Sequence, residues 1–140
     1  MSLVVDIANA IVQSLNEGIF SRPFTAVRVY RPSFALEELK DLHVTVVPKT
    51  LTSQASDRVT SQQDVEIDIA IQQQAGDDQA IDDLMGLVEE IADYFRQNRQ
   101  LPGVGAWWVK TENNPIYAPD QLQQLHVFTS LLTVTFRTLR

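Results

Sequence analysis

Two stretches of the chain repeat apolar residues at intervals of three and four, the spacing of one helix face. The first predicts an N-terminal helix over residues 4–15, with Ser2 placed to cap its start and Gly18 placed to end it. The second predicts a longer helix over residues 81–95, beginning after the acidic cap residue Asp77. Because both helices are amphipathic, we expect each to lay one face against a common apolar layer.

The rest of the apolar pattern is typical of strands, with either strict alternation or a run of β-branched and aromatic residues. Five strands are predicted, over residues 24–30, 42–47, 65–71, 106–110 and 125–137. Pro48 is expected to end the second strand, since proline cannot donate to a sheet ladder. The last strand has apolar residues on both faces, which predicts a central position or a covering partner. A short turn of helix is expected at residues 34–39.

Residues 49–63 have a different composition, mostly Ser, Thr, Gln and Asp with few apolar side chains. They are predicted to form a long polar loop that closes a hairpin between the strands at 42–47 and 65–71. Loops of this length in compact domains tend to be functional or mobile.

Taken together, the pattern runs helix, strand, strand, strand, helix, strand, strand. It predicts an α+β fold, a two-layer sandwich in which two helices pack on one face of a mostly antiparallel sheet of about five strands. At 140 residues the chain is expected to be a single domain over residues 1–140. It has no cysteine, which excludes disulfides, thiol nucleophiles and thiolate zinc sites.

The chain has a net charge of −7, and every charged residue from Asp64 to Asp93 is acidic. Such a surface disfavours binding to nucleic acid phosphates and to anionic membranes. Polar residues interrupt the N-terminal apolar stretch, and no apolar run approaches the roughly 20 residues that span a bilayer. We therefore expect a protein made in the cytoplasm that does not enter membranes.

One row of acids invites a catalytic interpretation. Asp64, Glu66 and Asp68 project from the same face of a predicted strand and could hold Mg²⁺ for phosphoryl transfer. Such sites need acids that converge from separate elements, so a solvated outer face of the strand is the simpler interpretation. His126 and Ser130 lie too far apart on a regular strand for a hydrolase triad, and no glycine pattern cradles phosphate. We assign no catalytic, cofactor-binding or metal-ligating residue.

The adjacent Trp107 and Trp108 must point to opposite faces of their strand. One of them is expected in the core, and the other faces solvent, a covering helix or a partner. An exposed tryptophan is a candidate interface anchor.

The order of elements resembles that of the tail-terminator and tail-completion proteins of long-tailed bacteriophages, the family related to the minor tail protein that caps the lambda tail. No motif in it is a catalytic signature. The resemblance rests on residues 42–48 (LHVTVVP), 65–71 (VEIDIAI), 82–91 (DDLMGLVEEI), 117–120 (YAPD) and 127–136 (VFTSLLTVTF).

The resemblance implies a structural virion protein without cofactors, located in the tail or neck. It implies a homohexameric ring that sits on the tail tube, stops the polymerisation of the tube protein and offers a surface to the head–tail connector and neck proteins. DNA would pass through the ring without specific binding. In such a ring the polar loop, represented by Thr50, Ser53, Arg58 and Gln62, is a candidate subunit interface, as are Trp107 and Trp108.

The acids suggest a further hypothesis for that ring. Either the row Asp64, Glu66 and Asp68 or the acids of residues 77–93 would line the channel and keep DNA from adhering. Three other functions remain open from the sequence: a head-completion or stopper protein of the neck, an Mg²⁺-dependent nuclease, and a small acidic adaptor protein.

Overall fold

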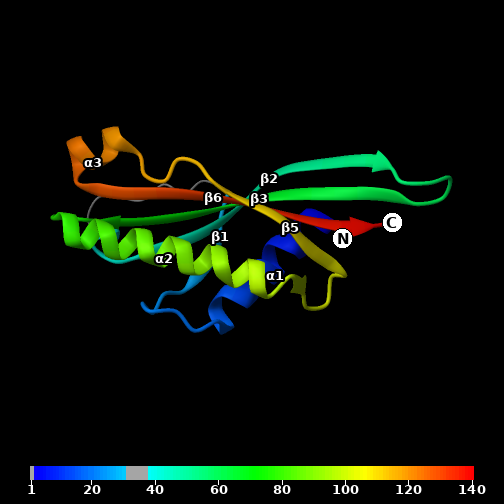
Figure 1. Ribbon diagram of the computed structural model, residues 1–140, viewed down its shortest axis with the longest axis horizontal. Helices are drawn as coiled ribbons and strands as arrows, with labels where there is room; N and C mark the ends of the chain where they lie inside the picture. Colours follow the sequence, from blue (N-terminus) through cyan, green and yellow to red (C-terminus); the bar gives the residue numbers. More distant parts are fainter. Residues whose placement is uncertain (1, 31–37) are drawn as a thin grey trace.

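The computed structural model describes residues 2–30 and 38–140 and contains one six-stranded sheet in the order β1-β2-β3-β6-β5-β4 (Figure 1). The strands are β1 (Ala26–Arg28), β2 (His43–Ala55), β3 (Ser61–Gln74), β4 (Gln100–Leu101), β5 (Ala106–Asn113) and β6 (Val127–Leu139). The helices are α1 (Leu3–Glu17), α2 (Asp78–Gln97) and α3 (Pro119–Leu125), with a 3-10 turn η1 (Glu38–Lys40). The predicted α+β fold is confirmed.

The centre of the sheet is the antiparallel pair β3 and β6. Their register runs without a break from Gln62 opposite Leu139 to Gln74 opposite Val127. The long C-terminal strand is therefore central, which explains why it carries apolar residues on both faces. All neighbouring strands are antiparallel except β1 and β2, which run parallel over residues 26–28 and 44–46.

The apolar alternation predicted for residues 65–71 forms the floor of the core. The isoleucine and valine side chains of this face are completely buried, as is Phe136 across the β3–β6 ladder. Both α1 and α2 cover this same face (Figure 1). Phe95 of α2 meets Phe136 edge to face, with ring centroids 5.9 Å apart. The two-layer arrangement with both helices on one face is thus present.

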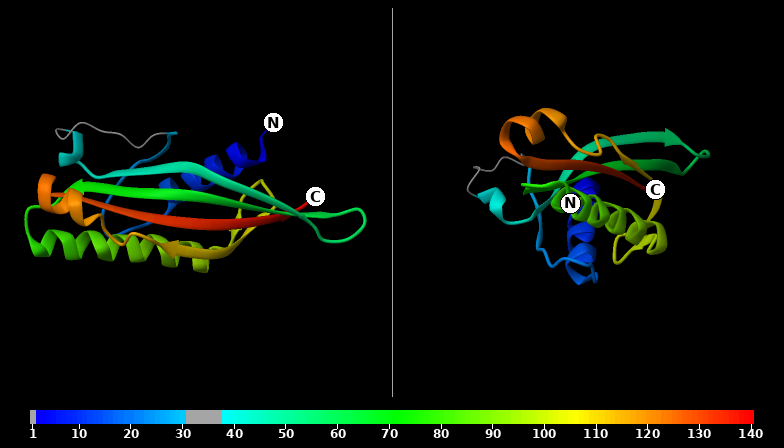
Figure 2. Two further views of the ribbon diagram at one scale, coloured as in Figure 1. Left: turned by 90° about the horizontal axis from the view of Figure 1, so that it is seen from above. Right: turned by 60° about the vertical axis from the view of Figure 1, so that its left-hand side comes forward.

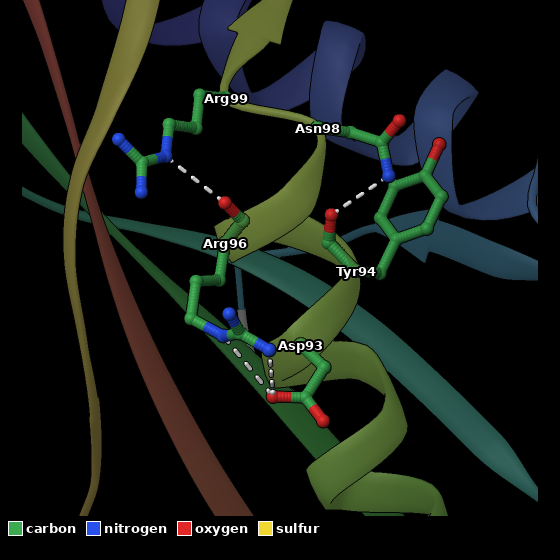
Figure 3. A network of polar contacts seen from close by, with 5 residues as sticks. All are labelled: Asp93, Tyr94, Arg96, Asn98 and Arg99. Atoms are coloured by element: carbon green, nitrogen blue, oxygen red, sulfur yellow. Dashed lines mark hydrogen bonds and ion pairs between the residues drawn. The ribbon is translucent and has the colours of Figure 1, made fainter.

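The helix ends agree with the sequence signals. Ser2 accepts the N–H of Val5 at 3.3 Å, and Asp77 accepts that of Ala80 at 2.8 Å. Figure 3 shows the C-terminal end of α2, where the Asn98 amide donates to the Tyr94 carbonyl at 2.9 Å. Side chains thus satisfy backbone groups that a helix terminus leaves without intrahelical partners.

Two arginine side chains also lie at this C-terminal end of α2. The Arg99 Nε donates to the Arg96 carbonyl at 3.0 Å, and Arg96 lies 3.4 Å from Asp93 (Figure 3). Positive charge beside the last carbonyls is favourable because the helix dipole is negative there. The hydroxyl of Tyr94 donates to the Ser14 carbonyl at 3.1 Å and so joins α2 to α1.

Two predictions about the second strand are wrong. Pro48 does not end it: β2 continues to Ala55, and the register shifts by one residue between Pro48 and Thr50. Proline fits because β1 covers only residues 44–46, so Pro48 lies at a bulge on an open edge, where its missing N–H costs no ladder bond. The predicted loop over residues 49–63 is instead mostly ladder, with a turn only at residues 56–60.

The strand and helix counts also differ from the prediction. The sheet has a sixth strand, the two-residue β4, and a third helix, α3, occupies part of the predicted loop after β5. Pro119 at the start of α3 is a helix-initiation signal that the turn interpretation overlooked. β1 is shorter than its predicted range. Of the helical turn expected at 34–39, only the part in η1 can be assessed, since residues 31–37 lie outside the described residues.

We predict that Phe136→Ala lowers the free energy of unfolding by about 3–5 kcal/mol, because it removes a fully buried ring from the helix–sheet interface. Leu51→Ala is the control, because Leu51 is 49% exposed, and its cost should stay within about 0.5 kcal/mol. Urea unfolding of both variants measures the difference. Equal losses would contradict the placement of the core.

Candidate functional site

The face of the sheet opposite α1 and α2 holds the acidic row singled out from the sequence. We call it the open face. It is defined by eight residues that the register places side by side, together with Lys49 of β2, whose ammonium lies beside Asp68. The eight are Asp64, Glu66 and Asp68 of β3, Thr133, Thr135 and Arg137 of β6, and Lys110 and Glu112 of β5.

Asp64 is held by a guanidinium from the neighbouring strand. Arg137 Nε and Nη2 donate to the two carboxylate oxygens at 2.8 and 3.1 Å, a bidentate arrangement. The hydrogen bonds from Arg137 hold the pKa of Asp64 below its usual value. The same pair raises the pKa of Arg137. Asp64 is thus a structural ion-pair partner, with its acceptor oxygens already engaged.

Asp68 is engaged as well. The Thr133 hydroxyl donates to its Oδ1 at 2.6 Å, and the Lys49 Nζ lies 3.9 Å from the same oxygen. Glu66, between them, has no ion-pair partner among the described residues. The three acids therefore lie in one row, as predicted, but in three different environments.

The open face is close to neutral in charge. Four acids (Asp64, Glu66, Asp68 and Glu112) face three cations (Lys49, Lys110 and Arg137), which leaves a net charge of −1. No lysine or arginine lies among the three acids of β3 in the sequence. All three cations belong to other strands and reach these acids through strand pairing. The row is therefore not a bare acidic surface.

The geometry does not assemble a metal centre here. Within residues 2–30 and 38–140, no three His, Asp or Glu side chains gather closely enough to hold a metal ion. The expectation that His126 and Ser130 lie on one strand is wrong, because β6 begins at Val127 and His126 is the left-handed C-cap residue of α3. Ser130 is buried and accepts a hydrogen bond from the Asn113 amide at 3.0 Å.

A second candidate surface is the hairpin formed by the ends of β2 and β3, which we call the arm (residues 49–63). Figure 2 shows its tip projecting past the helices along the long axis of the molecule. All four candidate interface residues lie on it: Thr50 and Ser53 on β2, Arg58 in the turn, and Gln62 on β3. Their role as an interface stays a prediction.

The arm is ordered by hydrogen bonds. The Ser53 hydroxyl donates to the Gln63 amide oxygen at 2.6 Å across the ladder. At the tip, Asp57 Oδ1 accepts the N–H groups of Val59 and Thr60 at 2.9 and 2.7 Å, which lowers the pKa of Asp57. This is an Asx-type turn, in which the side chain takes the place of a backbone acceptor. The arm presents Val59 at 90% exposure.

The two tryptophans point to opposite faces, as predicted. Trp108 packs against the core, donates from Nε1 to the Thr111 hydroxyl at 2.8 Å and lies 5.6 Å from the Arg99 guanidinium. Trp107 faces the other way, opposite Arg137 in the register, and is 36% exposed. Of the two, Trp107 is the one available to a partner.

Two further surfaces remain: the surroundings of α3, which were not singled out from the sequence, and the acids of residues 77–93, which were. α3 has no buried residue, and Ile116, Tyr117 and Leu125 around it are exposed apolar side chains. The outward side of α2 is strongly acidic and holds the exposed carboxylates of Asp78, Asp82, Asp83, Glu89 and Asp93. No helix in the described part of the chain is long and apolar enough to cross a bilayer.

We predict that Asp64→Asn destabilises the fold by about 1 kcal/mol at neutral pH, since it breaks a partly buried, bidentate ion pair. The pKa of Asp64 is lowered in the folded state, so the pair stabilises the fold above the unfolded value of 3.8. That stability is lost as the pH falls through the folded-state pKa. The difference in free energy of unfolding between the natural chain and the variant should therefore become smaller as the pH falls from about 5 towards 3.

Urea unfolding at several pH values measures this difference, with Glu66→Gln as the matched control. The control should match the natural chain at neutral pH. If the loss of unfolding free energy caused by Asp64→Asn stayed constant with pH, that result would contradict the assigned ion pair.

Comparison with known proteins gives likeness in structure alone. No model of a known protein family matches the chain, and no curated protein matches its sequence. A chain from the virion of a native gene transfer agent particle is similar in structure, with a TM-score of 0.53 and 15% identity over 94% of this chain and 92% of that one. This likeness shows a shared fold over nearly the full length of both chains.

Two further similarities are weaker and cover about half of the other protein. The sheath/tube terminator of an extracellular contractile injection system has a TM-score of 0.46 and 16% identity, over 96% of this chain and 56% of that one. The tube-terminating cap of the anti-feeding prophage has a TM-score of 0.43 and 17% identity, over 94% and 54%.

Proposed function

We propose that this protein is a structural component of a phage-like particle, a tail terminator that caps the tail tube. The observation that supports this most is the shared fold with a chain of the gene transfer agent virion, which extends over nearly the whole of both chains. Within the described residues, no group of three or more His, Asp or Glu side chains could hold a metal ion. The proposal is made for tail terminators in general, and the lambda-type branch is one form of it.

The proposed working state is a closed ring on the last ring of the tube, with six copies as the phage resemblance implies. A ring of identical subunits needs two different surfaces on each copy that match head to tail. The molecule offers separate candidates for these surfaces in the projecting arm and in the face around Trp107. The tube protein would contact one rim of the ring, and the neck proteins of the head would contact the other.

The proposed channel surface is the outward side of α2 rather than the row of the open face. Arg137, Lys110 and Lys49 nearly neutralise that row. On α2, by contrast, five acids are exposed. Among the described residues, the cations near them are Arg96 at the end of the helix and Arg22, which lines a surface depression together with Asp82 and Asp83. Like charge repels DNA phosphates within about 8–10 Å at physiological salt. An acidic helix facing the channel would therefore let DNA pass without binding.

The proposed function predicts control of tube length. Tail-tube protein from the same genome, polymerised alone, should give tubes without a defined upper length, and addition of this chain should shorten them in proportion to its concentration. Negative-stain images of the tubes measure their length, and a tag on the chain marks where it binds. Unchanged tube lengths together with no label at tube ends would contradict the proposal.

The channel assignment predicts a separate effect of charge reversal on α2. Asp82→Lys combined with Glu89→Lys places two cations on one exposed helix face, seven residues apart. Particles with this variant should assemble normally but deliver DNA less efficiently, because cations in the channel hold the phosphates. The neutral pair Asp82→Asn and Glu89→Gln is the control. Undiminished delivery by the reversed variant would place α2 outside the channel.

A further inference from the structure

The outer edge of β2 is open along the arm. β1 pairs with β2 only at Val44–Val46, and the sheet order puts no other strand of the described residues on that side. Beyond the bulge after Pro48, the edge therefore has no strand partner as far as Ala55. An open edge of this kind is a template for pairing with another chain.

The hydrogen bonds of Ser61 fix which backbone groups of this edge point outward. Its N–H and C=O both bond to Arg140, at 2.6 and 2.9 Å, so odd-numbered residues of β3 turn towards β6 and even-numbered ones turn towards β2. Gln62 pairs with Gln54, so beyond the bulge the backbone groups of the even-numbered residues of β2 bond inward to β3. The backbone N–H and C=O groups that point outward from this edge, in the plane of the sheet, are therefore those of Leu51, Ser53 and Ala55.

The opposite margin of the sheet has a second open edge, on β5. β4 covers only Ala106 and Trp107, and the Trp108 N–H bonds outward to the Arg99 carbonyl at 2.6 Å. Because even-numbered residues of β6 bond to β3, its odd-numbered residues bond to β5, and Thr133 lies opposite Glu112. Glu112 therefore bonds inward. The backbone N–H and C=O groups that point outward from the β5 edge are therefore those of Thr111 and Asn113.

The two edges suit each other in length, direction and charge. Residues 51–55 and 109–113 are stretches of five, and β5 runs opposite to β2 across the three antiparallel steps of the sheet. Each stretch has a net charge of zero, in a chain of net charge −7. Two copies joined here would bring no excess of like charge together, unlike two copies joined through the acidic α2.

The β2 edge also lacks the features that usually keep an edge strand unpaired. Residues 51–55 contain no charged residue and no proline, and Leu51 is half exposed. The absence of these protective features is explained if a partner strand covers this edge in the assembled state.

We propose that residues 51–55 of one copy pair antiparallel with residues 109–113 of the next copy, with Ser53 opposite Thr111. The sheet then continues from subunit to subunit around the ring, and each copy uses both of its open edges. Neighbouring copies are offset along the strands, as tilted strands are in a closed barrel. This inference rests on the proposed ring and names the contact that closes it.

Disulfide trapping tests the contact directly, because the natural chain has no cysteine. The test variant combines Ser53→Cys and Thr111→Cys. Within one molecule these positions are three strand spacings apart, at least about 14 Å, and the registers also offset them along the strands. This separation is too far for a disulfide. Between paired copies they would lie directly opposite, at about 5.5 Å between Cα atoms. Each single substitution is a control, and so is Ser53→Cys with Lys110→Cys, which places the second thiol on the other face.

Each chain is oxidised over a wide concentration range and analysed by non-reducing electrophoresis, with light scattering on the same samples. The double variant should lose nearly all of its monomer band to a ladder that ends in one closed species and returns to monomer on reduction. Single variants should form no species above a dimer, and the Lys110 control should form no ladder.

Three results would overturn the proposed pairing. A ring seen by light scattering without a disulfide ladder would mean that other surfaces close it, and the tail-terminator function would stand. Complete dimerisation of Ser53→Cys alone would mean that two β2 edges pair with each other. A chain that remains monomeric without a ladder would exclude pairing through these edges, and the tube-length assay would then judge the function separately.

Discussion

The ladder between β3 and β6 is the constraint on which the rest of the molecule depends. Its register is continuous along β6, so every residue of these two strands has a fixed face and a fixed neighbour. On one face this aligns the buried isoleucines of β3 with Phe136 and creates the layer on which α1 and α2 pack. On the other face it brings Arg137 to Asp64 and Thr133 to Asp68. The same strands extend beyond the helices and support the arm.

The elements with one buried face could be predicted from the sequence. In residues 65–71 the apolar residues alternate with the two-residue period of a strand, and in α1 and α2 they recur with the period of a helix. The cap residues mark where the two helices begin and end. The arm could not be recognised in this way, because both of its faces are exposed and no apolar period remains. What orders it is the backbone ladder and the Asp57 turn, and the ladder leaves no hydrophobic signal in the sequence.

The candidate site shows a similar limit. The sequence places Asp64, Glu66 and Asp68 in one row, and the structure confirms that they share a face. Their partners come from positions far along the chain, with Arg137 separated from Asp64 by more than half of the sequence. The run of acids in the sequence describes the exposed side of α2 well, because these carboxylates point to solvent and few cations from other elements lie beside them. Such runs describe a central strand poorly, because its neighbours are set by strand pairing.

The surface that results is divided by charge. The excess of acids lies on α2, while the open face is nearly neutral and the two open sheet edges carry no net charge. Association through neutral edges is compatible with a strongly acidic chain, because the repulsive surfaces can stay apart. In the proposed ring, this separation would let the subunits associate through neutral edges while acidic surfaces repel DNA phosphates.

The most direct test of the account is cryo-electron microscopy of particles made by cells that carry this gene, with the chain placed by its own side-chain density. We expect a single closed ring of this fold at the end of the tail tube nearest the head, with the tube stopping there. Absence of the chain from purified particles, or its presence along the tube wall or in the capsid shell, would contradict it.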